Sequence, residues 1–274
     1  MDFLEILSVI FLGIVQGVTE WLPVSSTGHM ILVDEFLNFS YSPEFREVFF
    51  VVIQLGSILA VVLLFWKQLM PFKLRHGFSV LPDKIRLWTK IMIACVPAAI
   101  IGILFDEPIE ALLFNPPVVA TTLIGYGIVF IIIENMNKTH EPKTIDTAQV
   151  TYKSALLIGL FQLLALVPGT SRSGATIIGG MILGMSRQTA AEFTFFLAIP
   201  VMFGASLLRI MRVGLDFTTA EWITLGLGTA VAFVVSIITI KFLLGFIKRN
   251  NFKPFGYYRI ALGILVILYF VFWG

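Results

Sequence analysis

Charged residues are scarce in this sequence: they make up 13% of its 274 residues, whereas soluble globular domains contain about 25%. The net charge is only +2, so the chain lacks the concentrated basic surface that binds nucleic acid, and we expect no nucleic-acid partner. Cysteine is nearly absent as well. The single cysteine, Cys95, cannot form a disulfide within the chain, and its apolar surroundings predict an ordinary small core residue. The low charge therefore argues against a soluble domain.

Long apolar segments take the place of the missing charge, and hydrophobic residues account for 58% of the chain. A helix of about 20 apolar residues is long enough to cross a bilayer. We predict six such spans, at 46–66, 88–105, 117–134, 190–212, 220–247 and 256–273. The chain is therefore predicted to be an all-α polytopic membrane protein.

Two further apolar segments, 3–37 and 152–186, are interrupted in the middle by prolines, glycines and small polar residues. Irregular backbone at membrane depth survives only where protein or a water-filled cavity satisfies its polar groups. We therefore predict that each segment is a re-entrant helix–loop–helix that enters and leaves the membrane on one side. A loop outside the membrane is the alternative, and the apolar flanks suit it poorly.

The two interrupted segments match each other at an offset of 146 residues. The offset pairs Gly13 with Gly159, Gln16 with Gln162, Ser25 with Ser171, Thr27 with Ser173 and Gly28 with Gly174. Since three spans follow each segment, we predict two repeats, 1–136 and 150–274, that form one membrane domain. An odd number of spans per repeat inverts the second copy in the membrane. Interrupted segments at corresponding positions of inverted repeats indicate a binding site near the midplane.

The distribution of lysine and arginine predicts the orientation, because loops rich in these residues stay in the cytoplasm. The loop after the first span and its flanks contain Lys67, Lys73, Arg75, Lys84, Arg86 and Lys90. This loop is predicted to be cytoplasmic, which places both termini and the site on the external side of the membrane. Arg209 and Arg212 fall outside in this scheme and count against it.

Ionisable residues inside the interrupted segments are candidates for function, because charge at membrane depth is costly. Glu20 precedes the first break, and Gln16, four residues earlier, shares its helix face. Arg172, in the second break, is the only basic residue between Lys153 and Arg187. A guanidinium binds phosphate oxygens through two parallel hydrogen bonds. The alternative role for Glu20 is that of a structural partner for Arg172.

Small hydroxyl residues follow both breaks. One of Ser25, Ser26 and Thr27 is expected to cap the half-helix that begins there, and helix N-termini bind anions. His29 lies three residues after Ser26 on the same helical face, a spacing that suits a nucleophile and its base. A buried histidine that is merely hydrogen-bonded is the alternative. This set of groups fits phosphoryl chemistry better than ion conduction.

These residues carry a family resemblance. Residues 16–29 (QGVTEWLPVSSTGH) resemble the first signature of the undecaprenyl-pyrophosphate phosphatases, the bacitracin-resistance family. Residues 168–176 (PGTSRSGAT) resemble the second, and the likeness extends over the chain in length, span count and motif spacing. The first signature begins with Glu or Gln in this family. Here it begins with Gln16, which has no carboxylate.

The resemblance implies a bacterial cell-membrane enzyme that hydrolyses undecaprenyl pyrophosphate to the monophosphate and phosphate, recycling the lipid carrier for cell-wall synthesis. It also implies a divalent cation, Mg²⁺ or Ca²⁺, and we assign the metal to Glu20. The catalytic positions fall on Glu20, Ser26, His29 and Arg172. Supporting positions, predicted to bind substrate, fall on Gln16, Ser25, Thr27, Ser171, Ser173, Gly174 and Thr176.

Several alternatives stay open at this point. Ser26 is expected to attack the terminal phosphorus with His29 as base, although His29 itself is the alternative nucleophile. Inverted repeats with broken helices also occur in secondary transporters, so a transporter or polyprenyl-phosphate flippase is the competing class. Membrane lipids are expected partners, and association as a homodimer is left open.

Overall fold

The structure is a computed structural model, and it describes residues 3–37, 41–73, 79–138 and 141–272. Arg75 lies outside these ranges, and the side chain of Thr27 is also outside the description. The helices are α1 (Phe3–Thr19), α2 (Ser26–Phe36), α3 (Pro43–Leu64), α4 (Trp66–Leu69), α5 (Pro82–Leu113), α6 (Pro116–Met136), α7 (Tyr152–Leu163), α8 (Arg172–Ile182), α9 (Arg187–Val213), α10 (Thr219–Ile247) and α11 (Lys253–Phe272). Two 3-10 turns, η1 (Thr147–Gln149) and η2 (Leu164–Leu166), flank α7.

Six helices in the described part of the chain are long and apolar enough to cross a membrane: α3, α5 over Pro82–Phe105, α6, α9, α10 and α11. Each contains one of the six predicted spans almost entirely, so the prediction of an all-α multi-pass membrane protein is confirmed. The helix α5 begins six residues before its predicted span, because the polar residues of its first turns continue the helix outside the apolar window. The short helix α4 and the antiparallel strands β1 (Phe72–Lys73) and β2 (Ser79–Val80) were not predicted.

Large apolar side chains cover much of the outer surface of these helices. Leu104 of α5, Met211 of α9 and Ile238 of α10 are each more than half exposed. Exposed apolar patches of this extent are rare on soluble monomers. They are expected where hydrocarbon is the solvent, which agrees with the membrane assignment.

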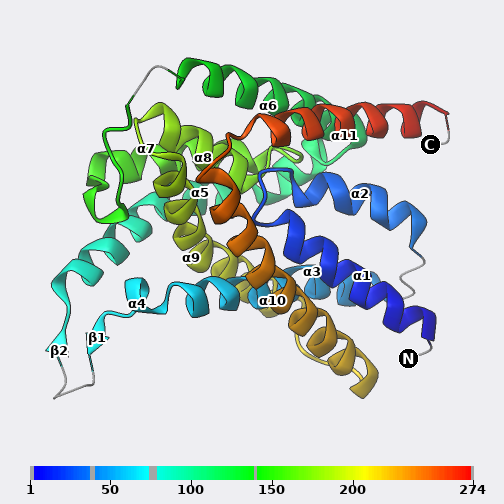
Figure 1. The fold of residues 1–274 in the computed structure, drawn as a ribbon. Helices are drawn as coiled ribbons and strands as arrows, with labels where there is room; N and C mark the ends of the chain where they lie inside the picture. Colours follow the sequence, from blue (N-terminus) through cyan, green and yellow to red (C-terminus); the bar gives the residue numbers. More distant parts are fainter. Residues whose placement is uncertain (1–2, 38–40, 74–78, 139–140, 273–274) are drawn as a thin grey trace.

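The helices pack through small residues that let backbones approach closely. α3 contacts α10 and α5 contacts α7, and a glycine lies at each crossing. A Cβ atom on Gly56 would lie 2.3 Å from the Thr229 carbonyl oxygen, and one on Gly159 would lie 2.4 Å from that of Ala94. Such contacts stabilise helix pairs where lipid removes the hydrophobic driving force between them. In Figure 1, α6 and α11 run side by side along one edge of the bundle.

Each predicted interrupted segment is a helix, a turn and a second short helix. α1 ends at Thr19 and α2 begins at Ser26, and the two helices pack side by side in Figure 1. α7 and η2 lead through a second turn into α8 at Arg172. The turns join well-packed helices, so their polar groups are fixed relative to the bundle.

Candidate active site

The two turns end in serines with the same unusual backbone conformation. Ser25 has a φ of 73° and Ser171 a φ of 72°, the only positive values among the described non-glycine residues. A non-glycine residue in this region costs of order 1–3 kcal/mol, and such strain concentrates at functional sites. Each serine caps the helix that follows. The Ser25 hydroxyl accepts from the Gly28 amide at 3.3 Å, and the Ser171 hydroxyl accepts from the Gly174 amide at 3.2 Å.

A buried ion pair joins the first turn to the second helix start. The Arg172 Nη2 atom lies 3.0 Å from Glu20 Oε1, and the two side chains are 13% and 8% exposed. The amide nitrogen of Gln16 donates to the other Glu20 oxygen at 3.0 Å, and Arg172 Nη1 donates to the Thr194 carbonyl oxygen at 3.3 Å. The structure thus brings Gln16, Glu20 and Arg172 together, and the direct pair of Glu20 with Arg172 is the contact that the alternative, structural role of Glu20 predicts. The bond to the Thr194 carbonyl oxygen of α9 orients the guanidinium.

The hydroxyl groups of the second motif form bonds inside the protein. Ser173 Oγ donates to the Glu20 carbonyl oxygen at 3.2 Å and lies 3.2 Å from Ser171 Oγ. Thr176 donates to the Arg172 carbonyl oxygen at 2.9 Å and accepts from the Thr194 hydroxyl at 2.9 Å. Both residues are buried. These contacts hold α8 against the first turn and α9. In this structure the two hydroxyls, which the sequence predicted to bind substrate, are hydrogen-bonded to protein groups and position the elements of the site.

Ser26 and His29 are less buried, and no hydrogen bond joins them. Within the described residues the Ser26 hydroxyl has no hydrogen-bond partner. Both ring nitrogens of His29 are occupied: Nδ1 lies 2.7 Å from the Ser25 carbonyl oxygen and Nε2 lies 2.7 Å from the Tyr258 hydroxyl. A carbonyl oxygen can only accept, so Nδ1 carries a proton. The neutral ring then accepts from Tyr258 at Nε2.

Sequence reasoning missed Tyr258, Arg259 and Thr194. The Tyr258 ring stacks on His29 with centroids 5.6 Å apart and an interplanar angle of 9°. Arg259 contacts backbone carbonyl groups of both turns. A signal for Arg259 was available, because it is an arginine inside a predicted span and intramembrane charge marks function. Nothing local in the sequence marks Thr194, whose backbone carbonyl provides the contact.

The donor set near Arg172 can be tested against the divalent cation that the sequence predicts. Among the described residues, no three His, Cys, Asp or Glu side chains gather as a metal cluster. Glu20 is the carboxylate at the site, and each of its oxygens accepts one hydrogen bond and has a second lone pair. Mg²⁺ is commonly bound through one or two carboxylates together with substrate phosphates and water. The residues present therefore fit a cation that is held jointly with a phosphate ligand.

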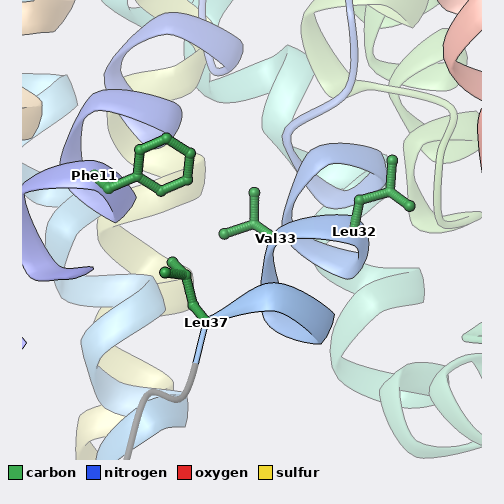
Figure 2. Close-up of a pocket in the computed structure, with 4 residues that line it drawn as sticks. All are labelled: Phe11, Leu32, Val33 and Leu37. Atoms are coloured by element: carbon green, nitrogen blue, oxygen red, sulfur yellow. The ribbon is translucent and has the colours of Figure 1, made fainter.

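An apolar groove of about 300 Å³ lies beside α2, and its lining residues Leu32 and Val33 follow His29 by one helical turn. Figure 2 shows Phe11 of α1 facing Val33 and Leu37 across it, and Leu32 completes the lining. None of these side chains has a titratable or nucleophilic group. The chemistry of the protein is therefore expected at the two turns.

Comparisons with known proteins identify the family of the chain. Residues 9–265 match the family described as bacitracin resistance protein BacA. A protein of Lachnoclostridium phytofermentans named undecaprenyl-diphosphatase is 60% identical over 271 residues, covering 99% of each chain. Proteins of Enterococcus faecalis (57% identical, 98% of each chain) and Clostridioides difficile (58%, 98% of this chain and 97% of the relative) are named undecaprenyl-diphosphatase and undecaprenyl-diphosphatase 1. The chain therefore belongs to the bacitracin resistance protein BacA family.

Proposed function

We propose that this membrane protein is a hydrolase that cleaves undecaprenyl diphosphate to undecaprenyl phosphate and inorganic phosphate. The activity follows from the name shared by its relatives over nearly full length. The reaction returns the lipid carrier to cell-wall synthesis, in agreement with the bacitracin resistance of the family. One observation supports the location of the site above all others. A guanidinium, Arg172, stands at a helix N-terminus 3.0 Å from a buried carboxylate in the opposite turn.

Each group has a role in this proposal. Arg172 and the first amides of α2 and α8 hold the diphosphate and stabilise the charge that develops during phosphoryl transfer. Ser26 Oγ attacks the terminal phosphorus, the bond to the bridging oxygen breaks, and undecaprenyl phosphate leaves. His29 takes the Ser26 proton, and water then hydrolyses the phosphoserine. His29 as nucleophile is the alternative, and either assignment requires His29 Nε2 to give up its bond to Tyr258.

We assign the divalent cation, Mg²⁺ or Ca²⁺, to Glu20 with the Gln16 side-chain oxygen as a secondary ligand. When bound, the cation would neutralise negative charge on the phosphate oxygens. Gln16 adds no second carboxylate, so the remaining ligands would come from substrate and water. Glu20 pairs with Arg172 in the state described here, and it would hold the metal when substrate is bound.

We further propose two inverted repeats, 1–136 and 150–274, each opening with a re-entrant segment, 3–37 or 152–186. The equal backbone angles of Ser25 and Ser171 support this proposal. So does the packing: α1 contacts α10 as α7 contacts α5, and α3 of the first repeat contacts α9, its counterpart in the second. The site would face the external side. Homodimer formation stays a prediction.

Phosphate release by the purified protein separates an enzyme from a transporter. We expect the protein in detergent with Mg²⁺ to release one phosphate per undecaprenyl diphosphate, and we expect a chelator to stop the release. An Arg172→Ala preparation controls for a contaminating phosphatase. If the wild type moves the lipid between leaflets of a vesicle and releases no phosphate, the transporter alternative replaces this proposal.

A further inference from the structure

Arg259 is an arginine of α11 that is completely buried in the bundle. Its Nη1 donates to the Pro23 carbonyl oxygen at 3.2 Å, and its Nη2 donates to that of Gly169 at 2.8 Å. Nη2 also lies 3.4 Å from the carbonyl oxygen of Thr122 in α6. One side chain from the last helix therefore contacts both turns that present the candidate site.

The two acceptors occupy equivalent places in the two turns. Pro23 and Gly169 are 146 residues apart, which is the offset between the matched motifs, and each lies two residues before the serine that caps the next helix. The guanidinium thus bridges matching carbonyl groups. It is well placed to fix the separation of the helix starts at Ser26 and Arg172.

No carboxylate contacts Arg259 among the described residues. Its partners are carbonyl dipoles and the ring of Tyr126, whose centroid lies 5.7 Å from the guanidinium carbon, and its Nε has no hydrogen-bond partner. A buried charge that lacks an ionic partner costs several kcal/mol. An apolar residue at this position could pack in the bundle without the free-energy cost of burying a charge. We therefore expect the arginine to have a role in holding the two turns that it contacts.

We propose that Arg259 is a positioning residue that ties the two turns together and sets the distance between Ser26 and Arg172 across the bound diphosphate. The inference rests on the proposed function for its catalytic consequence. Its structural part, the tie between the turns, stands independently. Only an arginine suits this role, because its planar fork reaches two separate acceptors, whereas a lysine ammonium at the end of a flexible stem reaches one of them well.

The test compares Arg259→Lys with Arg187→Lys as a matched control. Arg187 also bonds through its fork, to the buried Glu134 carboxylate, but it lies away from both turns. We expect Arg259→Lys to lower kcat about 30- to 100-fold with a smaller change in KM, since misplacing reacting groups by 1 Å costs about 100-fold. Arg187→Lys should lower the melting temperature in detergent and leave kcat within about threefold. Equal kcat losses in the two variants at equal melting temperature would mean that Arg259 acts through stability alone.

Chemical rescue adds a readout that a stability role does not move. Guanidinium ion at millimolar concentration should restore part of the kcat of Arg259→Ala and none of the loss in Arg187→Ala. If Arg259→Ala does not fold, Arg259→Lys, which keeps the charge and most of the stem, still decides the question. Wild-type kcat in Arg259→Lys would overturn the proposal.

A distance measurement keeps the inference separate from the proposed activity. Spin labels on cysteines at Ile14 and Leu164, both exposed and close in sequence to the two turns, report the separation of the segments in a Cys95→Ala background. We expect one narrow distance distribution in the wild type and a broader or shifted one in Arg259→Lys. An unchanged distribution would refute the tie, whether or not the wild type releases phosphate.

Discussion

At the residue scale, the Arg172 guanidinium already has an anionic partner where the diphosphate is proposed to bind. Glu20 and Arg172 are 3.0 Å apart and nearly buried, so the pair is only weakly screened by solvent. If a substrate phosphate and a divalent cation entered together, each member of the pair would exchange its partner for one of the same sign of charge. Glu20 would bind the cation, and Arg172 would bind the phosphate. The pair therefore fits a resting state of the site.

The substitution Arg172→Lys keeps the charge and removes the fork. We expect it to reduce transition-state stabilisation by about 2–4 kcal/mol, judged from the removal of single donors in other enzymes. The measurement is kcat/KM for phosphate release at saturating Mg²⁺, with the melting temperature as the control for folding. Near-normal turnover in the lysine variant would identify Arg172 as a structural partner of Glu20.

The nucleophile can be identified at the same scale. The Ser25 hydroxyl caps α2, whereas the Ser26 hydroxyl has no hydrogen bond within the described residues. We expect Ser26→Ala to abolish turnover while substrate still binds, because an interaction needed only in the transition state is lost. Ser25→Ala, the matched control, should cost about 1 kcal/mol of helix capping and retain measurable activity.

Acid quenching during turnover, followed by mass spectrometry, assigns the covalent intermediate. Phosphate on Ser26 supports the proposed mechanism, and phosphate on His29 reassigns the nucleophile. If neither residue is labelled, and oxygen-18 from water enters phosphate in a single turnover with inversion at phosphorus, water attacks directly. His29→Ala should be severe under both covalent assignments, so it does not distinguish them.

At the scale of elements, the second turn depends on close backbone packing against α6. Gly169 has a φ of 85°, and a Cβ atom there would lie 2.2 Å from Thr122 Oγ1 and 2.7 Å from the Val119 carbonyl oxygen. The Thr122 hydroxyl donates to the neighbouring Pro168 carbonyl oxygen at 2.7 Å. The helix α6 therefore shapes the turn that leads to Arg172.

The substitution Gly169→Ala should disrupt this turn. We expect a loss of about 1–3 kcal/mol from the backbone conformation and about as much again from overpacking against α6, with a drop in both melting temperature and kcat. Gly214→Ala is the matched control, because Gly214 also has a positive φ of 90° but has no neighbour within 4 Å of an added Cβ. Equal shifts in melting temperature for the two variants would show that the contact with α6 is unimportant.

The sequence predicted some features of these elements and not others. The six long helices were predicted because an apolar run of bilayer length has few other stable structures. Capping of the first half-helix by one of Ser25, Ser26 and Thr27 was predicted as well, and the structure assigns it to Ser25, with Ser171 in the same role in the second motif. The positive φ of both serines was not, since it depends on how each turn is held by neighbouring helices.

At the scale of the whole molecule, the orientation in the membrane stays a prediction from the distribution of lysine and arginine. Arg209, which counted against that orientation, pairs with Glu47 at 3.2 Å, so its charge is balanced at the proposed external end. At the opposite end, Arg187 binds the buried Glu134, which also accepts from the Phe252 amide at 2.8 Å. Different ion pairs therefore lie near the two ends of α9.

Cysteine labelling of intact cells tests the orientation. Cysteines replacing Ser79 and Asp216, both exposed, are introduced singly into a Cys95→Ala background. With cytoplasmic 67–87 and external termini, a membrane-impermeant maleimide should label position 216 and not position 79 until the cells are opened. The reverse pattern would refute the orientation and place the site on the cytoplasmic side.

The sequence by itself determined the membrane class, the six spans, the two motifs and the prediction that the two motifs meet at one site. These features depend on local composition, and the last follows from the match between two segments that both carry turn formers. Only the tertiary structure decided which hydroxyls are taken up by internal bonds, that His29 contacts Tyr258, and that Arg259 joins Pro23 to Gly169. These contacts link residues 90 to 236 positions apart and end largely on backbone carbonyl groups, which every residue possesses. Because a backbone carbonyl is present at every position, the sequence does not indicate which one accepts a hydrogen bond from Arg259. That choice depends on how the helices pack.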